Sequence, residues 1–396
     1  MPRLFGRDLT RRELERHVGA RGQAFGVTLV EHADGPERGV RTVEFRTGGG
    51  LSFTVNVDRS MDIGRLEHRG VPIAWQSGTG FRSPWLQVPM EDNGSGFMRG
   101  FSGFLCTCGL DHMRQPESGP ADHFDTPLRA RVDYPLHGRG ALAPARLAGY
   151  GEHWDGDACT LWCEGVVMQV QVLGEHLSLT RRIEARVGES SLVIRDRVVN
   201  EGFARTPHML LYHINLGWPL LDEGARFRAP VRGVNASNAA AGIQAGGYRT
   251  QLGPTARFIQ QVFDHDVVAD RDGRVPAALI NDRLGLGLLV DYEAAKFPCL
   301  QQWQAYGEGI YAMGIEPCTS HWGTRAHGVE RGEIVWLEHG QSRDYDTRIG
   351  VVEGAGAIAA LEARIDAIHP QLAAEVPPRE RQPEGGPVIE TQTARR

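Results

Sequence analysis

Two residues of the chain, His213 and Glu316, combine side chains suited to proton transfer with positions on or beside apolar strands. Glu316 follows the apolar residues 311–315 and directly precedes Pro317, which holds the glutamate in an extended conformation. Partial burial at such a position would raise the pKa of the carboxyl group toward the range that suits a general base. A strand-end glutamate in a structural ion pair has the same pattern, so position alone leaves both interpretations open.

His213 follows the apolar residues 209–212 and precedes Asn215 and Gly217, so we expect it on a strand or at the strand's exit. Its ordinary pKa near neutrality suits it to donate and accept protons. A core histidine that is hydrogen-bonded to backbone is the alternative interpretation. His208 lies five residues earlier, and spacing does not choose between the two histidines.

Polar residues in glycine-flanked loops form a second group of candidates. Arg99 and His137 each precede a glycine, so the backbone can approach a ligand closely there. Asp111 lies with Arg99 in an irregular segment, residues 78–123, and long irregular segments in compact domains are usually functional or mobile. Aromatic rings that could stack on the apolar face of a sugar lie near these clusters: Trp85, Phe97, Phe101, Trp218, Trp303 and Tyr306. Each ring taken singly fits core packing equally well.

Most of the chain has the sequence pattern of short strands separated by turns. Residues 40–45 and 51–57 alternate apolar and polar side chains around the glycines at 48–50, which predicts a hairpin. Strand-like stretches at 161–173, 177–187 and 191–200 are separated by Gly-Glu turns. So many regular strands predict a large all-β sandwich.

Both ends of the chain differ from this middle. Residues 1–24 contain a capping box at Thr10 and Glu13, which predicts a short helical lead-in before a β-sandwich domain at 25–352. Residues 353–370 contain an apolar stripe of helical period, and His369-Pro370 ends it. Residues 371–396 are rich in Pro, Glu, Arg and Gln without periodicity, so we expect a disordered tail.

Composition narrows the class of partner and compartment. The chain has 396 residues and a net charge of −6 without a basic stripe, which argues against nucleic acid and anionic membranes as partners. No apolar run reaches the length of a membrane span and no signal-peptide core is visible, so we expect a cytoplasmic protein. A small neutral molecule is the favoured partner.

The six cysteines predict buried thiols rather than disulfides in a cytosolic chain of this size. Cys106 and Cys108 are two residues apart in an apolar run, so strand alternation would point both to one face. The repeated C-x2-C spacing of a zinc site is missing, so no structural zinc site is predicted.

The order of the candidate motifs resembles the aldose 1-epimerase superfamily, the galactose mutarotase-like enzymes and their hexose-phosphate epimerase relatives. The resemblance covers residues 25–350 and rests on four short motifs in the same order: Arg99-Gly100, His137-Gly138, His213 and Glu316-Pro317. Residues 61–66 are similar to the family's opening hairpin strand. Gln301-Gln302-Trp303 lies where members often place a ligand-contacting glutamine or tryptophan.

This resemblance implies a large antiparallel β-supersandwich with one concave sugar site and no metal or redox cofactor. Glu316 would take the proton of the anomeric hydroxyl while His213 protonates the ring oxygen, so the ring opens and recloses as the other anomer. The residues implied to contact the monosaccharide or modified sugar are Arg99, Asp111, His137, Gln302 and Trp303.

Three alternatives stay open at this stage. The same fold serves non-catalytic sugar-binding proteins, and also lyases and glycoside-processing enzymes that act on longer chains. A metal enzyme built from residues such as His112, His123 and His137 lacks an H-x-H or H-E-x-x-H pattern. The sequence leaves open which sugar binds and whether that sugar carries a carboxylate or phosphate. It also leaves the assembly open, with a homodimer as one candidate.

Overall fold

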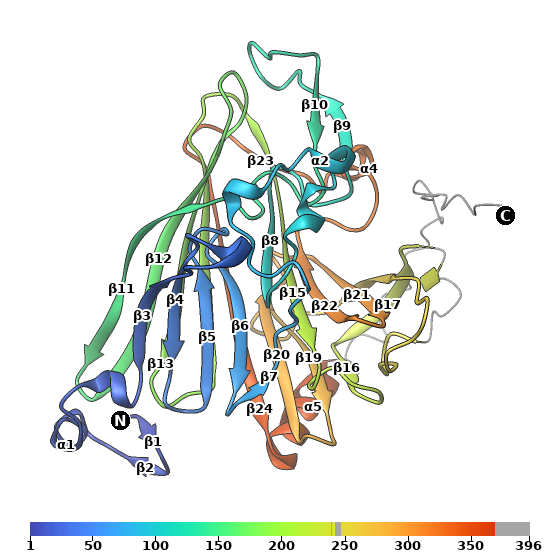
Figure 1. Cartoon of the computed structure of the whole chain (residues 1–396). Helices are drawn as coiled ribbons and strands as arrows, with labels where there is room; N and C mark the ends of the chain where they lie inside the picture. The colour runs from blue at the N-terminus through green and yellow to red at the C-terminus, as the bar shows by residue number, and fades with distance from the viewer. Residues whose placement is uncertain (239, 242–246, 369–396) are drawn as a thin grey trace.

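The computed structural model describes residues 1–238, 240–241 and 247–368. Three large sheets dominate it, and their neighbouring strands pair antiparallel (Figure 1). The all-β fold expected from the strand pattern is confirmed. Among the described residues, no helix is long and apolar enough to cross a membrane.

The first sheet has five strands in sequence order: β3 (Gly26–Glu31), β4 (Arg41–Arg46), β5 (Leu51–Asn56), β6 (Asp62–His68) and β7 (Val71–Pro72). The predicted hairpin is its β4–β5 pair. The second sheet has eight strands in the order β11 (Ala145–Asp155), β12 (Ala158–Val170), β13 (His176–Arg186), β14 (Ser191–Asn200), β24 (Ser342–Glu353), β20 (Leu286–Glu293), β19 (Arg274–Asn281) and β16 (Arg226–Arg228). Its β12, β13 and β14 confirm the three long predicted strands.

The third sheet has seven strands and carries both His213 and Glu316. Its order is β17 (Val231–Ala236), β18 (Gln261–Val267), β21 (Cys299–Gly307), β22 (Ile310–Cys318), β15 (Thr206–Gly217) and β23 (Val335–Leu337), and β8 (Leu105–Leu110) also pairs with β15. Two small ribbons complete the strands: β1 (Arg3–Leu4) with β2 (Arg7–Asp8), and β9 (Glu117–Pro120) with β10 (Arg131–Tyr134).

Helices are short and lie at the ends and in loops. The α-helices are α1 (Arg11–His17), α2 (Glu91–Gly94), α4 (Arg325–Glu330) and α5 (Ala355–Ile368), and the 3-10 turns are η1 (Arg21–Gln23), η2 (Gly35–Glu37), η3 (Pro84–Leu86) and η4 (Gly96–Arg99). The capping box at Thr10 and Glu13 is present in α1. The expected tail, residues 371–396, lies outside the described residues.

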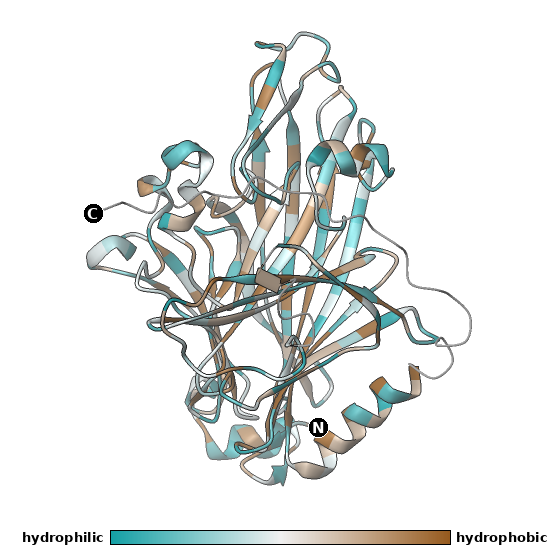
Figure 2. Cartoon of the chain, turned by 90° about the vertical axis from the view of Figure 1, so that its right-hand side faces the viewer, coloured by the Kyte–Doolittle hydropathy of each residue, from teal (hydrophilic) through white to brown (hydrophobic). Residues whose placement is uncertain are grey.

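Helix α5 buries the predicted stripe against the eight-stranded sheet. Ile358, Leu361 and Ile365 pack with Ala278 and Ile280 of β19, and Figure 2 shows the alternation of apolar and polar residues along this helix. All six cysteines are buried free thiols, as expected. Cys106 and Cys108 share one face of β8 and one apolar cluster.

A buried ion network joins the three sheets. The Arg181 guanidinium, on β13, donates to Asp196 of β14 at 2.8 and 2.6 Å and to Asp62 of β6 at 2.9 Å. On the third sheet, the Thr107 hydroxyl accepts from Arg181 at 2.7 Å and the Tyr212 hydroxyl donates to Asp196 at 2.5 Å. Each charge of this network therefore has a partner, although the Arg181 side chain is 0% exposed.

Replacing Arg181 with methionine would leave two carboxylates buried without their cation. We expect Arg181→Met to lose about 3–5 kcal/mol of unfolding free energy in urea titrations, because breaking a buried pair strands the remaining charge. The neighbouring Arg182 pairs at the surface with Glu184, so Arg182→Met should lose no more than about 1 kcal/mol. Equal losses in the two variants would contradict the role given to the network.

Candidate acid–base site on the seven-stranded sheet

The register of β15 and β22 places His213 directly opposite Glu316. Leu211 pairs with Cys318 and Ile214 with Ile315, so His213 and Glu316 fall between these pairs on adjacent strands. The Nε2 atom of His213 lies 3.3 Å from Oε1 of Glu316, and the two side chains are 6% and 5% exposed. The two residues selected from the sequence are thus brought into contact by strand pairing.

The same row of the sheet continues on both sides of this pair. Cys106 of β8 lies opposite His213, Gln301 of β21 lies opposite Glu316, and Asp264 of β18 lies opposite Gln301. Directly opposite residues of antiparallel strands share a face. The seven-stranded sheet therefore presents one row of largely polar side chains that centres on His213 and Glu316.

Aromatic rings enclose the His213 imidazole. The ring centroids of Phe101 and Trp303 lie 4.7 and 5.2 Å from that of His213. The His137 ring lies 5.6 Å away and nearly perpendicular, and the Trp75 ring packs on both Phe101 and Trp303. These apolar walls lower the local dielectric, which strengthens electrostatic interactions in the site.

A glycine leaves room for the carboxylate. A Cβ atom on Gly314 would collide with Oε1 of Glu316 and would lie 3.2 Å from both the His213 ring and the Trp303 side chain. Gly314 faces the same side as Glu316 because it lies two residues earlier on β22. Any larger residue at this position would displace the acid–base pair.

Burial shifts both proton-transfer groups toward their neutral forms. It raises the pKa of Glu316 to about 8. Burial, and then the nearby His137, hold the pKa of His213 well below its usual value. Within the described residues, Nδ1 of His213 has no hydrogen-bond partner, and Oε1 of Glu316 has none besides its 3.3 Å contact with His213. The pair therefore retains unused hydrogen-bonding capacity.

His137 adds a second neutral imidazole beside the pair. Burial lowers its pKa to about 4. Its Nδ1 lies 3.1 Å from the carbonyl oxygen of Met113, and because a carbonyl can only accept, Nδ1 carries the proton. Nε2 of His137 is then a hydrogen-bond acceptor.

The structure brings His137 and Trp303 to the site but places the other three predicted sugar contacts elsewhere. Arg99 is half exposed and pairs with Asp92 at 2.8 Å. Asp111 is buried and accepts a hydrogen bond from Gln169 at 2.7 Å. Gln302 lies on the opposite face of β21, where its amide donates to the Tyr248 carbonyl at 2.9 Å.

Strand alternation explains the Gln302 position and also settles the choice of histidine. Gln301, not Gln302, shares the face of Trp303, because these two residues are separated by an even number of positions. His208 and His213 are five residues apart on one strand and therefore face opposite sides. His208 bonds the Tyr345 hydroxyl and the Leu110 carbonyl, at 2.6 and 2.8 Å.

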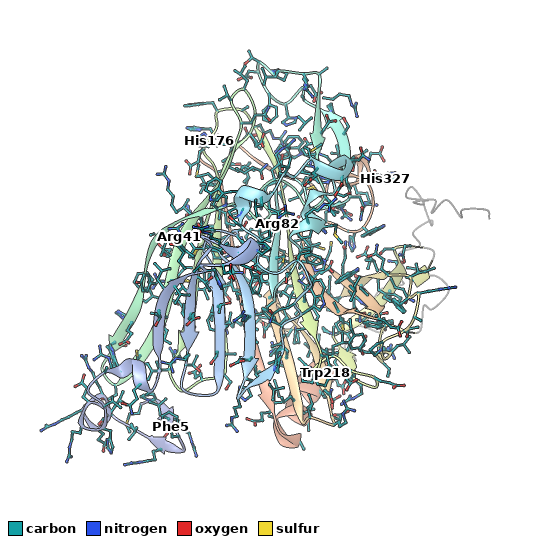
Figure 3. The ribbon with its side chains drawn as sticks, in the orientation of Figure 1. Phe5, Arg41, Arg82, His176, Trp218 and His327 are labelled. Carbon is teal, nitrogen blue, oxygen red and sulfur yellow. The ribbon has the colours of Figure 1, made fainter. Side chains whose placement is uncertain are left out.

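Two further polar groups at this face had no signal in the sequence motifs. Asp264 closes the row and pairs with Nδ1 of His321 at 3.0 Å. Arg114, in the loop after β8, is buried and donates to the Ser320 hydroxyl at 3.1 Å. Trp218, a candidate for sugar stacking, lies instead at the lower end of the molecule, where it is exposed (Figure 3).

Metal ligation requires several converging donors. In the part of the chain that the structure describes, no three His, Cys, Asp or Glu side chains form a group that could hold a metal ion. The groups that converge are instead one carboxyl, two imidazoles and the rings around them.

The raised pKa of Glu316 predicts a cost to stability. The unfolded chain ionises this carboxyl near 4.5, whereas the folded protein keeps it protonated up to about pH 8, so stability falls as the pH rises between these values. We expect Glu316→Gln to be more stable than the parent at about pH 9, by on the order of 4 kcal/mol. The two proteins should match near pH 4, below both pKa values. Denaturant titrations at the two pH values measure this, and a pH-independent difference would contradict it.

Comparison with known proteins identifies the family and the fold of the chain. The chain matches a family described as "Domain of unknown function (DUF4432)" over residues 37–351. No curated protein matches its sequence. Among solved structures, a protein of Klebsiella pneumoniae named as a candidate aldose 1-epimerase superposes with a TM-score of 0.80 at 24% identity, covering 87% of this chain and 88% of its own.

More distant structures share the same architecture. A galactose mutarotase-like protein of Clostridium acetobutylicum has a TM-score of 0.55 at 14% identity, with 83% of this chain and 99% of that one covered. Galactose 1-epimerase of Lactobacillus acidophilus has a TM-score of 0.53 at 12% identity, with the same coverage. The chain belongs to the DUF4432 family and has the galactose mutarotase-like fold.

Proposed function

We propose that this protein interconverts the anomers of a monosaccharide by general acid–base ring opening and closure. The observation that carries the proposal is the buried contact of 3.3 Å between Nε2 of His213 and Oε1 of Glu316, in which Nδ1 of His213 has no hydrogen-bond partner among the described residues. The names of the structurally similar proteins, which include a galactose 1-epimerase, point to the same chemistry.

The reactive form of the pair holds one proton. Transfer of that proton from Glu316 to His213 gives a carboxylate beside an imidazolium. The carboxylate removes the proton of the anomeric hydroxyl, the bond between the anomeric carbon and the ring oxygen breaks, and the imidazolium protonates that oxygen. After the carbonyl carbon rotates, the reverse transfers close the ring as the other anomer and return the proton to the pair.

The surrounding residues support this chemistry in distinct ways. The rings of Trp303 and Phe101 offer apolar surface to the C–H face of the sugar. Nε2 of His137 can accept a hydrogen bond from a sugar hydroxyl. General acid and general base catalysis each supply roughly 100- to 10,000-fold, which is sufficient because ring opening already proceeds in water.

Removing either proton-transfer group should strongly slow the interconversion of anomers. We expect Glu316→Gln and His213→Asn each to lower kcat/KM for anomer interconversion by about 100-fold or more, with folding intact by circular dichroism. The measurement is exchange NMR on fresh anomers of aldoses, uronic acids and deoxy sugars. Matched controls are Glu164→Gln on the exposed face of β12 and His176→Asn at the upper left of Figure 3, which should keep full activity.

Three outcomes would count against the proposal. Full activity in both site variants would contradict the catalytic role given to His213 and Glu316. Saturable sugar binding with interconversion no faster than in buffer would identify a non-catalytic binding protein. Cleavage of oligosaccharides without anomer exchange would identify a lyase or glycoside-processing enzyme.

The pH profile tests the one-proton form. The pair loses this proton as Glu316 ionises, at a pKa of about 8, and gains a second only well below the usual pKa of histidine. We therefore expect kcat/KM to be level through neutral pH and to fall above about pH 8. A rate that rises through this region would mean that the doubly deprotonated pair reacts, contrary to the mechanism.

A further inference from the structure

Arg114 is a buried cation with no carboxylate in direct contact among the described residues, although Asp264 and Glu333 act on its charge from a greater distance. Its residue is 6% exposed, and its guanidinium donates from Nη2 to the Ser320 hydroxyl at 3.1 Å. Nη1 is buried without a hydrogen-bond partner among the described residues. Burial lowers the pKa of this guanidinium, which reflects the cost of holding the charge away from water.

The other deeply buried arginines are satisfied within the fold. Arg59 donates to the carbonyl oxygens of Arg82 and Gly100. Arg181 has its two carboxylates. A buried ion without a contacting counter-ion costs several kcal/mol. The described residues supply no contacting group for Nη1 of Arg114.

Arg114 borders the acid–base site through the His137 loop. The His137 amide donates to the Arg114 carbonyl at 2.8 Å, and the charge of Arg114 contributes to the lowered pKa of His137. Its bond to the Ser320 hydroxyl places the guanidinium just beyond the end of β22, two residues past Cys318.

Cys299 and Cys318 lie between this end of the sheet and the row of His213 and Glu316. Cys318 lies two residues beyond Glu316, and Cys299 lies opposite it, two residues before Gln301. One such step along a strand is about 7 Å, comparable with the length of one monosaccharide. Nε2 of Gln301 is a second buried donor without a partner among the described residues.

We propose that the site takes a sugar that carries a carboxylate, a uronic acid, with Nη1 of Arg114 and Nε2 of Gln301 as donors to that carboxylate. This inference rests on the proposed function and specifies its substrate class. The carboxylate would lie beside the acid–base row, between Arg114 and Gln301, which is directly opposite Glu316, and it would be carried by the end of the sugar remote from the anomeric carbon.

The surrounding charges favour a single negative charge over a phosphate. Glu333 accepts from the Ser320 hydroxyl at 3.0 Å and pairs with Arg331 at 3.0 Å, and Asp264 pairs with His321. These carboxylates would repel a dianion more strongly than a single negative charge. A phosphate also favours several charged donors, whereas Arg114 is one guanidinium.

The test compares acidic sugars with their neutral parents. We expect the parent protein to interconvert D-glucuronate or D-galacturonate with a kcat/KM about 100-fold above that for glucose or galactose, and Arg114→Met to remove most of this preference. The readout is the ratio of kcat/KM for the acidic sugar to kcat/KM for its neutral parent, measured for each variant. Arg114→Lys keeps a charge and should keep part of the preference, and glucose 6-phosphate is the phosphorylated probe.

Binding by calorimetry to the Glu316→Gln variant separates this inference from the proposed function. Glucuronate affinity that depends on Arg114, without anomer exchange in the parent, would refute the function and leave the carboxylate site standing. Exchange of neutral and acidic sugars at equal rates would refute the carboxylate site and leave the function standing. Equal losses for both sugars in Arg114→Met, or a preference for the phosphorylated sugar, would also overturn the inference.

Discussion

The buried guanidinium of Arg181 is the interaction on which the position of the site depends. It holds Asp62 and Asp196 from the first two sheets and reaches the third sheet through Thr107 and Tyr212. Thr107 and Tyr212 lie opposite each other, one residue from Cys106 and His213, and therefore on the other face of the same strand pair. The ion network thus fixes β8 and β15 from behind, while the acid–base row projects from their front.

The buried ions behind these strands are paired within the fold. Behind β15, Arg181, Asp62 and Asp196 each have a partner of opposite charge, which is the condition under which buried ions are tolerated. In front of it, Glu316, His213, Gln301 and Arg114 all contain buried atoms without a hydrogen-bond partner in the described residues. Such unused capacity costs stability, and a ligand with complementary groups would recover it.

The shared fold supports a conclusion about architecture, whereas the residues of the site support a conclusion about chemistry. Membership in the DUF4432 family and similarity to mutarotase-like structures establish the architecture. The His213–Glu316 contact and its enclosure by aromatic rings support acid–base chemistry. Arg114, which none of the short motifs contains, supports an acidic sugar as the substrate.

The sequence by itself determined the strands, the capping box of α1, the apolar stripe of α5 and the pair His213 and Glu316, because these follow from local periodicity, turn chemistry and motif order. It did not determine which polar residues join that pair. Arg99 is paired with Asp92, and Asp111 is hydrogen-bonded to Gln169. Side chains alternate along β21, so Gln301 faces the site and Gln302 faces away from it. Arg114 and Asp264 reach the site only through loop packing and strand register. Those contacts join residues far apart in the chain, so only the tertiary structure decided them.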